Sequence, residues 1–177
     1  MLLGGARSGK SALAVDWGRA HDGPVTFVAT GEAGDGEMAA RITRHRAGRP
    51  SGWTTVEAPI DPTPAVVGAP GDALVIVDCL TLWVANVFGD LHDDAVLARA
   101  DVLGAAAAAR TAPTVVVTNE VGMGIVPADP MTRRYRDLLG GVNTLVVAHA
   151  AAAWLLVAGR ALALLAQADG PPAPRRP

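Results

Sequence analysis

The sequence predicts an α/β fold in which a mostly parallel central sheet is flanked by helices. Two observations support this prediction. Nearly continuous apolar runs alternate along the chain with stretches of helical pattern, and a glycine-rich segment joins the first apolar residues to the first helical stretch. Runs that are apolar throughout are typical of parallel strands covered on both faces, and the crossovers between such strands are usually helices.

The individual elements follow from these runs in order. A very short first strand is expected at residues 1–3, and buried strands are expected at 24–30, 73–79, 114–120 and 153–159. Helices are expected at 9–21, 36–47, 94–111 and 131–148. Residues 57–72 hold four prolines and are expected to form an irregular connection, whereas 167–177 are expected to be a disordered tail. The length then predicts one domain, over residues 1–166.

Composition argues against several classes of protein. Half of the residues are apolar and 18% are charged, which is typical of a globular domain. A net charge of −2 argues against a nucleic-acid or membrane-surface binder, which would usually be basic. Cys79 is the only cysteine, so an intrachain disulfide is impossible and a reducing cytoplasm is the expected location. The sequence shows no signal peptide and no apolar run typical of a lone spanning helix.

Residues 4–11, with the sequence GGARSGKS, fit the phosphate-loop pattern G-x-x-x-x-G-K-[ST]. Glycines let backbone N–H groups surround phosphate oxygens, and the following helix adds its positive N-terminal end. Lys10 is the single lysine beside fourteen arginines, which indicates a need for a compact ammonium at the outer phosphates. The Ser11 hydroxyl is suited to Mg²⁺. A plain Gly/Ser-rich loop would fit the same letters, but the strand–loop–helix context favours nucleotide binding.

Two further segments follow apolar runs and are candidates for the same edge of the sheet. Asp78 closes the run ALVIVD, where a carboxylate is well placed for Mg²⁺, although a turn or helix-capping aspartate would fit the same position. Residues 118–127, TNEVGMGIVP, follow another run, and Gly122 and Gly124 indicate either a tight loop at the rim of the site or a plain turn. The sequence has no guanine-reading N-K-x-D motif, which argues against a regulatory GTPase.

The segment RITRHRAGRP, residues 41–50, gathers four arginines around His45. On a helix, at about 100° per residue, His45 shares a face with Met38 and Ile42 while arginines flank it on either side. The pattern alone fits a partly buried structural histidine beside a solvated charged face. The alternative, which the pattern alone favours less because most lone histidines are structural, is a nucleophile: the arginines neutralise a triphosphate while a neutral imidazole attacks phosphorus.

Five segments in order along the chain resemble the bifunctional adenosylcobinamide kinase / adenosylcobinamide-phosphate guanylyltransferase family of cobalamin biosynthesis. They are GGARSGKS, EMAARITRHRAGRP, DCLTLWVAN, TNEVGMGIVP and RRYRDLLGGVN, and the resemblance spans about residues 1–160. It implies a P-loop NTPase fold of the RecA-like type, a homotrimer, and two reactions. A nucleoside triphosphate first phosphorylates the aminopropanol hydroxyl of adenosylcobinamide. A histidine then takes GMP from GTP and passes it to adenosylcobinamide phosphate, giving adenosylcobinamide-GDP.

The resemblance also implies roles for particular residues. The nucleophile of the family falls on His45, and Lys10 supports both reactions as a catalytic cation. Mg²⁺ would be held by Ser11 and Asp78, with GTP and ATP as substrates. The nucleotide-contacting residues of the family fall on Gly4, Gly5, Ala6, Arg7, Ser8, Gly9, Lys10 and Ser11, on Ala29, Thr30 and Gly31, on Arg46, Ala47, Gly48 and Arg49, and on Glu57 and Asp78.

Two rival functions stay open from the residues themselves. A single-activity P-loop kinase acting on another small alcohol would need Lys10, Ser11 and Asp78, but not His45. A non-catalytic nucleotide-binding module would bind GTP without consuming it. His21, His92 and His149 lie outside these motifs and are expected to be surface or packing residues.

Overall fold

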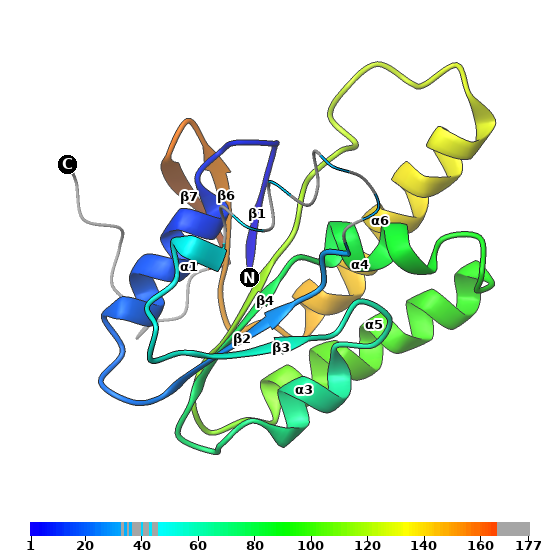
Figure 1. The fold of residues 1–177 in the computed structure, drawn as a ribbon. Coiled ribbons are helices and arrows are strands. Elements are labelled where there is room, and N and C mark those ends of the chain that lie inside the picture. Colours follow the sequence, from blue (N-terminus) through cyan, green and yellow to red (C-terminus); the bar gives the residue numbers. More distant parts are fainter. Residues whose placement is uncertain (33, 35, 37–39, 41–42, 44–45, 166–177) are drawn as a thin grey trace.

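The fold is a seven-stranded sheet with helices on both faces, and Figure 1 shows this arrangement in the computed structural model. The structure describes residues 1–32, 34, 36, 40, 43 and 46–165. The strands are β1 (Leu2–Gly4), β2 (Val25–Ala29), β3 (Thr54–Glu57), β4 (Leu74–Asp78), β5 (Thr114–Val117), β6 (Ala153–Val157) and β7 (Arg160–Leu165). The helices are α1 (Lys10–Arg19), α3 (Thr63–Gly68), α4 (Leu80–Val87), α5 (Asp93–Ala108) and α6 (Pro130–Ala148).

The strand order is β3-β2-β4-β5-β1-β6-β7, and β7 alone pairs in the antiparallel sense within the described residues. The β1 strand therefore lies inside the sheet, between β5 and β6, and β5 separates β1 from β4. Since parallel strands all end at the same edge, the loops that follow β1, β2, β4 and β5 meet there. This edge is where the sequence predicts the phosphate loop and Asp78.

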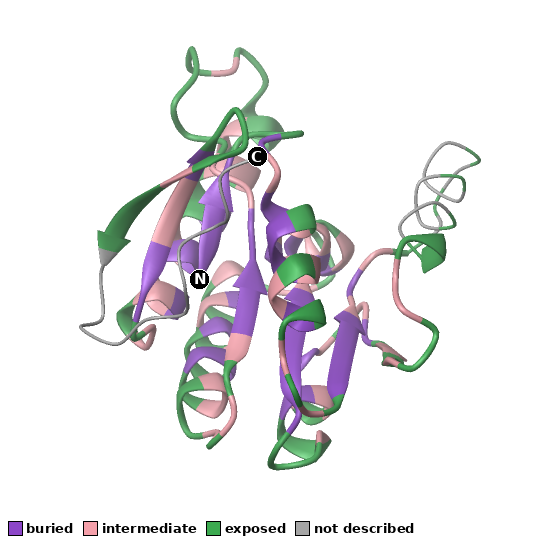
Figure 2. Cartoon of the chain, turned by 90° about the vertical axis from the view of Figure 1, so that its left-hand side faces the viewer, coloured by how far each residue is buried: buried purple, intermediate pink, exposed green. Residues whose placement is uncertain are grey.

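Two hydrophobic layers hold the helices on the sheet. Side chains of a strand alternate between faces, so Val75 and Val77 of β4 pack toward α3, α4, α5 and α6, whereas Leu74 and Ile76 pack toward α1. Figure 2 shows the central strands buried and the outer surfaces of the helices exposed. Trp83 of α4 is fully buried in the first layer, and its indole N–H donates to the carbonyl of Ile60 at 2.9 Å.

The structure confirms most of the predicted elements and corrects one segment. The four expected buried strands and the helices at 9–21, 94–111 and 131–148 correspond to β2, β4, β5, β6, α1, α5 and α6. The prediction of an irregular connection over 57–72 is wrong in part, because α3 lies within it. Pro62 and Pro64 occupy the start of this helix, where a missing N–H costs little. The expected helix at 36–47 and the tail 167–177 fall largely or wholly outside the described residues.

Three elements were not expected from the sequence: β3, α4 and β7. The β3 strand is short and mostly exposed, so it lacks the continuous apolar run that marks a buried strand. The β7 strand does have an apolar run, RALALL, but this run follows the expected strand at 153–159 after a turn at residues 158–159 and was not separated from it. The eight residues of α4 directly follow β4, so their apolar side chains merge with the strand pattern. Among the described helices, none has the length and apolar content needed to cross a membrane.

Leu103 and Val102 are neighbours on α5 and provide a matched test of the packing. Leu103 is fully buried, whereas Val102 is 56% exposed. We expect Leu103→Ala to lower the free energy of unfolding by about 2–5 kcal/mol, because it removes buried methyl groups and leaves a cavity. Val102→Ala is expected to change it by about 0.5 kcal/mol or less. Urea denaturation of both variants measures the difference, and equal effects would contradict the placement of α5.

Candidate active site

The carboxyl edge of the sheet brings the predicted site residues into one row. Glu57 of β3 and Asp78 of β4 both pair with Ala29 of β2, which lies between them. Asp78 in turn pairs with Val117 of β5, which pairs with Leu2 of β1. The row therefore runs from Glu57 through Asp78 to the strand that leads into the phosphate loop. This register follows from the parallel topology and could not be read from the separate motifs.

The phosphate loop depends on glycine at two of its positions. Gly4 and Gly9 have φ angles of 148° and 101°, which L side chains rarely adopt. A Cβ on Gly4 would lie 2.3 Å from the carbonyl oxygen of Leu156 in β6, so the space is closed as well. At the far end of the loop, the Ser8 carbonyl accepts a hydrogen bond of 3.0 Å from Gly159 in the turn between β6 and β7. The loop is thus packed between its own strand and a hairpin.

Lys10 is buried beneath this loop, with only 6% of its surface exposed. Its ammonium donates to the carbonyl oxygens of Gly4 at 2.8 Å and Gly5 at 2.7 Å, and to Ser8 Oγ at 3.3 Å. Lys10 is the first residue of α1, and no acidic residue lies in the first turn of that helix. The positive helix end and the ammonium therefore act together at one point, which favours a bound anion.

Thr30 fixes the backbone that follows Asp78. Thr30 is fully buried, and its hydroxyl both donates to the Cys79 carbonyl and accepts from the Cys79 N–H, each at 2.7 Å. The Thr30 N–H donates to the Asp78 carbonyl at 3.3 Å. From α4, the amide of Asn86 donates to the Thr30 carbonyl at 2.7 Å. These bonds join the ends of β2 and β4, so Thr30 acts on the position of Asp78 through the backbone.

The arginines after His45 lie on the β2–β3 side of the row. Arg46 forms an ion pair with Glu57, and both side chains are more than half exposed. Arg49 stacks over the Phe27 ring, with 3.7 Å between Cζ and the ring centroid, and contacts Thr55 Oγ1 at 3.5 Å. Burial lowers the pKa of Arg49, while the charges of Asp78 and Glu57 oppose this shift. The segment 46–49 therefore places two positive side chains near the predicted carboxylates of Glu57 and Asp78.

The predicted ligands fit a Mg²⁺ ion that is bound together with a nucleotide. Among the described residues, no group of three or more His, Cys, Asp or Glu side chains could hold a metal ion by itself. Mg²⁺ bound with a nucleotide usually takes one or two protein ligands and fills its other positions with phosphate oxygens and water. Ser11 and Asp78, both partly exposed at this edge, suit such a role. A metal cage built from protein alone does not fit these residues.

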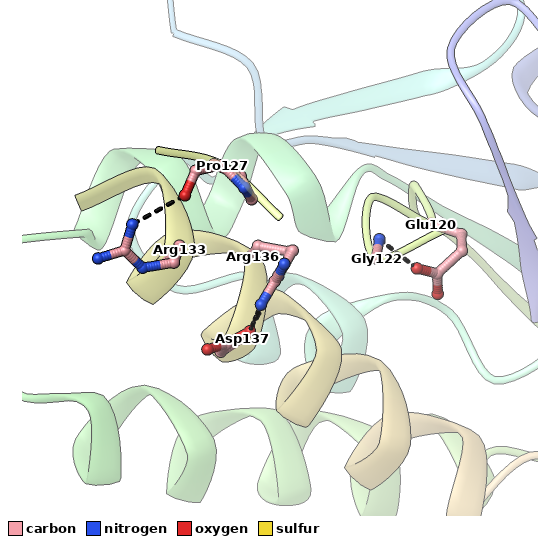
Figure 3. A network of polar contacts seen from close by, with 6 residues as sticks. All are labelled: Glu120, Gly122, Pro127, Arg133, Arg136 and Asp137. Carbon is pink, nitrogen blue, oxygen red and sulfur yellow. Dashed lines mark hydrogen bonds and ion pairs between the residues drawn. The ribbon is translucent and has the colours of Figure 1, made fainter. Parts of the chain in front are cut away.

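The segment after β5 contacts the phosphate loop directly. The N–H of Glu120 donates to the Gly4 carbonyl at 3.1 Å. The Glu120 carboxylate accepts from the Gly122 N–H at 2.5 Å, as Figure 3 shows. Further along the loop, Arg133 of α6 donates to the carbonyls of Pro127 at 2.8 Å and Ala128 at 2.6 Å. This segment therefore lies beside the phosphate loop, and both of its ends are held by hydrogen bonds.

Asn143 of α6 anchors the start of this loop from inside the protein. It is 5% exposed; its amide oxygen accepts from Thr118 Oγ1 at 2.7 Å, and its amide nitrogen donates to the Asn119 carbonyl at 3.0 Å. The Asn119 N–H donates to Thr81 Oγ1 of α4 at 2.8 Å. The backbone of Asn119 is therefore held on both sides. The only signal for Asn143 in the sequence is a polar residue on the apolar face of a helical pattern, and such a pattern does not by itself indicate a role.

The rest of this loop presents large apolar side chains to solvent. Met123 is 76% exposed, Ile125 97% and Val126 63%, and Met131 at the start of α6 is 66% exposed. Such a concentration of exposed apolar surface is unusual for a single chain. It lies beyond Gly122, on the part of the loop that follows Glu120.

The structure brings together most of the predicted site residues that it describes. Residues 4–11, Thr30, Glu57 and Asp78, with the segment 46–49, all lie along the carboxyl edge. His45, the predicted nucleophile, lies outside the described residues, as do Arg41 and Arg44. The other histidines match their expectation: His21 contacts the Asp72 carbonyl and His149 contacts Asp101, while His92 is exposed before α5. The sequence reasoning missed Asn86, Asn119, Glu120 and Asn143.

The reactivity of the Cys79 thiol, next to Asp78, measures how far this part of the site is closed to solvent. Burial, with a smaller effect of the Asp78 charge, raises the pKa of its thiol to about 11. At pH 8 we expect thiol reagents to label the folded protein at least about 100-fold more slowly than the unfolded chain, whose thiol ionises near pH 8.5. The unfolded thiol ionises first, so this group should lower the free energy of unfolding as the pH rises from about 9 to 11.

Cys79→Ala provides the control for this prediction. It should weaken the loss of stability between pH 9 and 11, measured by urea denaturation at each pH. Rapid, complete labelling of the folded wild-type protein at pH 8 would contradict the burial of the thiol.

Comparison with known proteins agrees with this site. The model of the family described as cobinamide kinase / cobinamide phosphate guanyltransferase, CobU, matches residues 1–164. The bifunctional adenosylcobalamin biosynthesis protein CobU of Salmonella typhimurium is 40% identical over 175 residues, covering 90% of this chain and 95% of that protein. The bifunctional adenosylcobalamin biosynthesis protein CobP of Pseudomonas aeruginosa is 37% identical over 163 residues, covering 90% and 92%.

A solved structure supports the fold. It belongs to a prototypical ATPase from the type III secretion system of pathogenic bacteria, and it matches with a TM-score of 0.52 at 14% identity. The match covers 88% of this chain but only half of that one, so the likeness concerns the P-loop NTPase fold alone. The family model matches nearly the whole chain, and the two relatives are 40% and 37% identical over at least 90% of both chains. The chain belongs to the cobinamide kinase / cobinamide phosphate guanyltransferase family.

Proposed function

We propose that this chain carries out both reactions of its family at the carboxyl edge of the sheet. It phosphorylates adenosylcobinamide with a nucleoside triphosphate, and it then transfers GMP from GTP to the phosphate so formed. The observation that carries the proposal is the row from Glu57 through Asp78 to the phosphate loop, with Lys10 buried at one end and Arg49 at the other. Lys10 supplies a cation at the phosphate loop, and Arg49 supplies one on the β2–β3 side of the row.

The phosphate loop serves both reactions in the same way. Its backbone N–H groups and the N-terminus of α1 hold phosphate oxygens, and Lys10 lies at the outer phosphates. These groups neutralise charge that develops when a bond to phosphorus breaks, which is the main contribution a protein makes to phosphoryl transfer. Mg²⁺ held by Ser11 and Asp78 would neutralise further charge on the phosphates.

His45 is the proposed nucleophile of the guanylyl transfer. A ring nitrogen forms a bond to the α-phosphorus of GTP, the bond from that phosphorus to the α,β-bridging oxygen breaks, and pyrophosphate leaves. An oxygen of adenosylcobinamide phosphate then attacks the same phosphorus and the phosphorus–nitrogen bond breaks. Support comes from the family resemblance and from the described neighbours of His45, since Arg46 and Arg49 carry charge to Glu57 and Asp78.

His45→Asn separates this proposal from a single-activity kinase. We expect the variant to lose guanylyl transfer by at least about 100-fold and to keep phosphorylation of adenosylcobinamide, because only the first loses its nucleophile. The measurements are incubation with α-labelled GTP, which should label the wild-type protein in an acid-labile and base-stable form, and separate assays of the two products.

His92→Asn is the matched control, because His92 is exposed and lies outside the site. It should keep both activities. Full guanylyl transfer by His45→Asn would refute the role of His45. A wild-type protein that binds GTP but consumes none in the presence of adenosylcobinamide phosphate would favour the nucleotide-binding module instead.

A homotrimer remains the expected assembly, on the resemblance alone. Light scattering coupled to gel filtration measures it, with a mass of about three times the 18.0 kDa chain as the expected result. A monomeric mass at micromolar concentration would contradict this expectation.

A further inference from the structure

Glu120 lies at the phosphate loop because of the strand order. It follows β5, the strand between β1, which leads into the loop, and β4, which ends at Asp78. Its N–H donates to the Gly4 carbonyl oxygen, and the ammonium of Lys10 donates to the same oxygen. The two nitrogens are therefore within about 6 Å of each other. Since Lys10 meets the outer phosphates in a loop of this kind, the Glu120 backbone lies beside the phosphoryl group that a kinase transfers.

The Glu120 carboxylate is also held in place, and it remains partly open to solvent. The Gly122 N–H donates to Oε1 at 2.5 Å, and a Cβ on Gly122 would lie 2.9 Å from that oxygen. Because position 122 is a glycine, the Glu120 carboxylate can come close enough to accept the hydrogen bond that holds it. The Asn119 backbone just before it is tied to α4 and α6. A carboxylate with a fixed backbone and one defined hydrogen bond is well prepared to take a proton from a substrate.

The carboxylates of Glu57 and Asp78, at the ends of β3 and β4, are less suited to that task. Glu57 is on β3, four strands away from β1 and so about 19 Å across the sheet, and it pairs with Arg46. Asp78 lies two strands from β1 and is the proposed Mg²⁺ ligand. The backbone of Glu120 contacts the phosphate loop directly, through the Gly4 carbonyl.

We propose that Glu120 is the catalytic carboxylate that accepts the proton of the acceptor hydroxyl in the kinase step. The hydroxyl oxygen forms a bond to the γ-phosphorus, the bond from that phosphorus to the β,γ-bridging oxygen breaks, and the nucleoside diphosphate leaves. The hydroxyl proton passes to a Glu120 carboxylate oxygen and returns to solvent after product release. This role rests on the proposed function and adds a residue to it.

The guanylyl transfer should not need Glu120, and this difference makes the role testable. Its acceptor is a phosphate monoester, which is largely deprotonated near pH 7 because its second pKa is about 6. Its first nucleophile is an imidazole, which attacks through a free electron pair. Only the alcohol of the kinase step must lose a proton as it attacks.

Glu120→Gln is the test. Glutamine keeps an oxygen that accepts from the Gly122 N–H but takes up no proton. We expect kcat for phosphorylation of adenosylcobinamide to fall by about 100-fold or more, with KM for ATP within about threefold of wild type. Guanylyl transfer to adenosylcobinamide phosphate supplied from outside should stay within about threefold. Asp137→Asn, on the neighbouring helix α6, is the matched control because Asp137 is exposed and pairs with Arg136; it should keep both activities.

The outcomes are distinct. A wild-type protein that forms no adenosylcobinamide phosphate refutes the proposed function and the role of Glu120 with it. An active wild type with a Glu120→Gln variant whose kinase kcat is within threefold refutes the role of Glu120 alone. Equal loss of both activities, or a large rise in KM for ATP, identifies a structural or metal-binding residue and also overturns the proposal.

Gly122→Ala provides a second variant at the same place. The added methyl displaces the Glu120 carboxylate without removing it, so we expect a partial loss of kinase activity with guanylyl transfer preserved. Unchanged kinase activity in this variant would argue against a fixed carboxylate.

Discussion

The carbonyl oxygen of Gly4 is the point on which the site depends. Gly4 is the last residue of β1, and its carbonyl oxygen accepts hydrogen bonds from the buried ammonium of Lys10 and from the N–H of Glu120. One oxygen therefore joins the phosphate loop, the helix that begins at Lys10 and the loop after β5. The arrangement needs glycine at position 4, because a side chain there would meet the backbone of β6. A change at Gly4 would alter three elements together, and a change at an exposed loop residue such as Gly5 would not.

In the strand order, β5 lies between the two halves of the site, with β1 on one side and β4, β2 and β3 on the other. The phosphate loop follows β1, whereas Thr30, Glu57 and Asp78 follow β2, β3 and β4 on the other side. The segment after β5 lies between the two halves and contacts the phosphate loop through the Gly4 carbonyl. Hydrogen bonds with Thr81, Asn143 and Arg133 hold this segment, which has little regular structure. A loop at this place must keep its shape when charged substrates enter and leave.

The sequence was enough to predict the parts of the fold that are locally consistent. The continuous apolar runs marked β2, β4, β5 and β6, and the GGARSGKS motif gave the phosphate loop with its strand and helix. The sequence was insufficient where an element or residue is defined by its contact with a part of the chain that is distant in sequence. The exposed strand β3 is defined by its pairing with β2, and α3 begins with prolines that suggest an irregular segment. The segment 118–127 was expected at this edge, but no local signal distinguished Glu120 within it, because its position is set by a contact with an oxygen 116 residues earlier in the chain.

The two proposed reactions make opposite demands on a nucleophile, and the site is arranged to meet both. An alcohol is a weak nucleophile until it loses its proton, so the kinase step needs a base close to the γ-phosphorus. An imidazole and a phosphate monoester already carry free electron pairs near pH 7, so the guanylyl transfer needs cations around the α-phosphorus instead. In this chain the backbone N–H of Glu120 and the ammonium of Lys10 donate to the same Gly4 oxygen, and the arginines of segment 46–49 lie on the opposite half of the row. A single triphosphate site can therefore serve two reactions, since each reaction uses a different end of the nucleotide's phosphate chain.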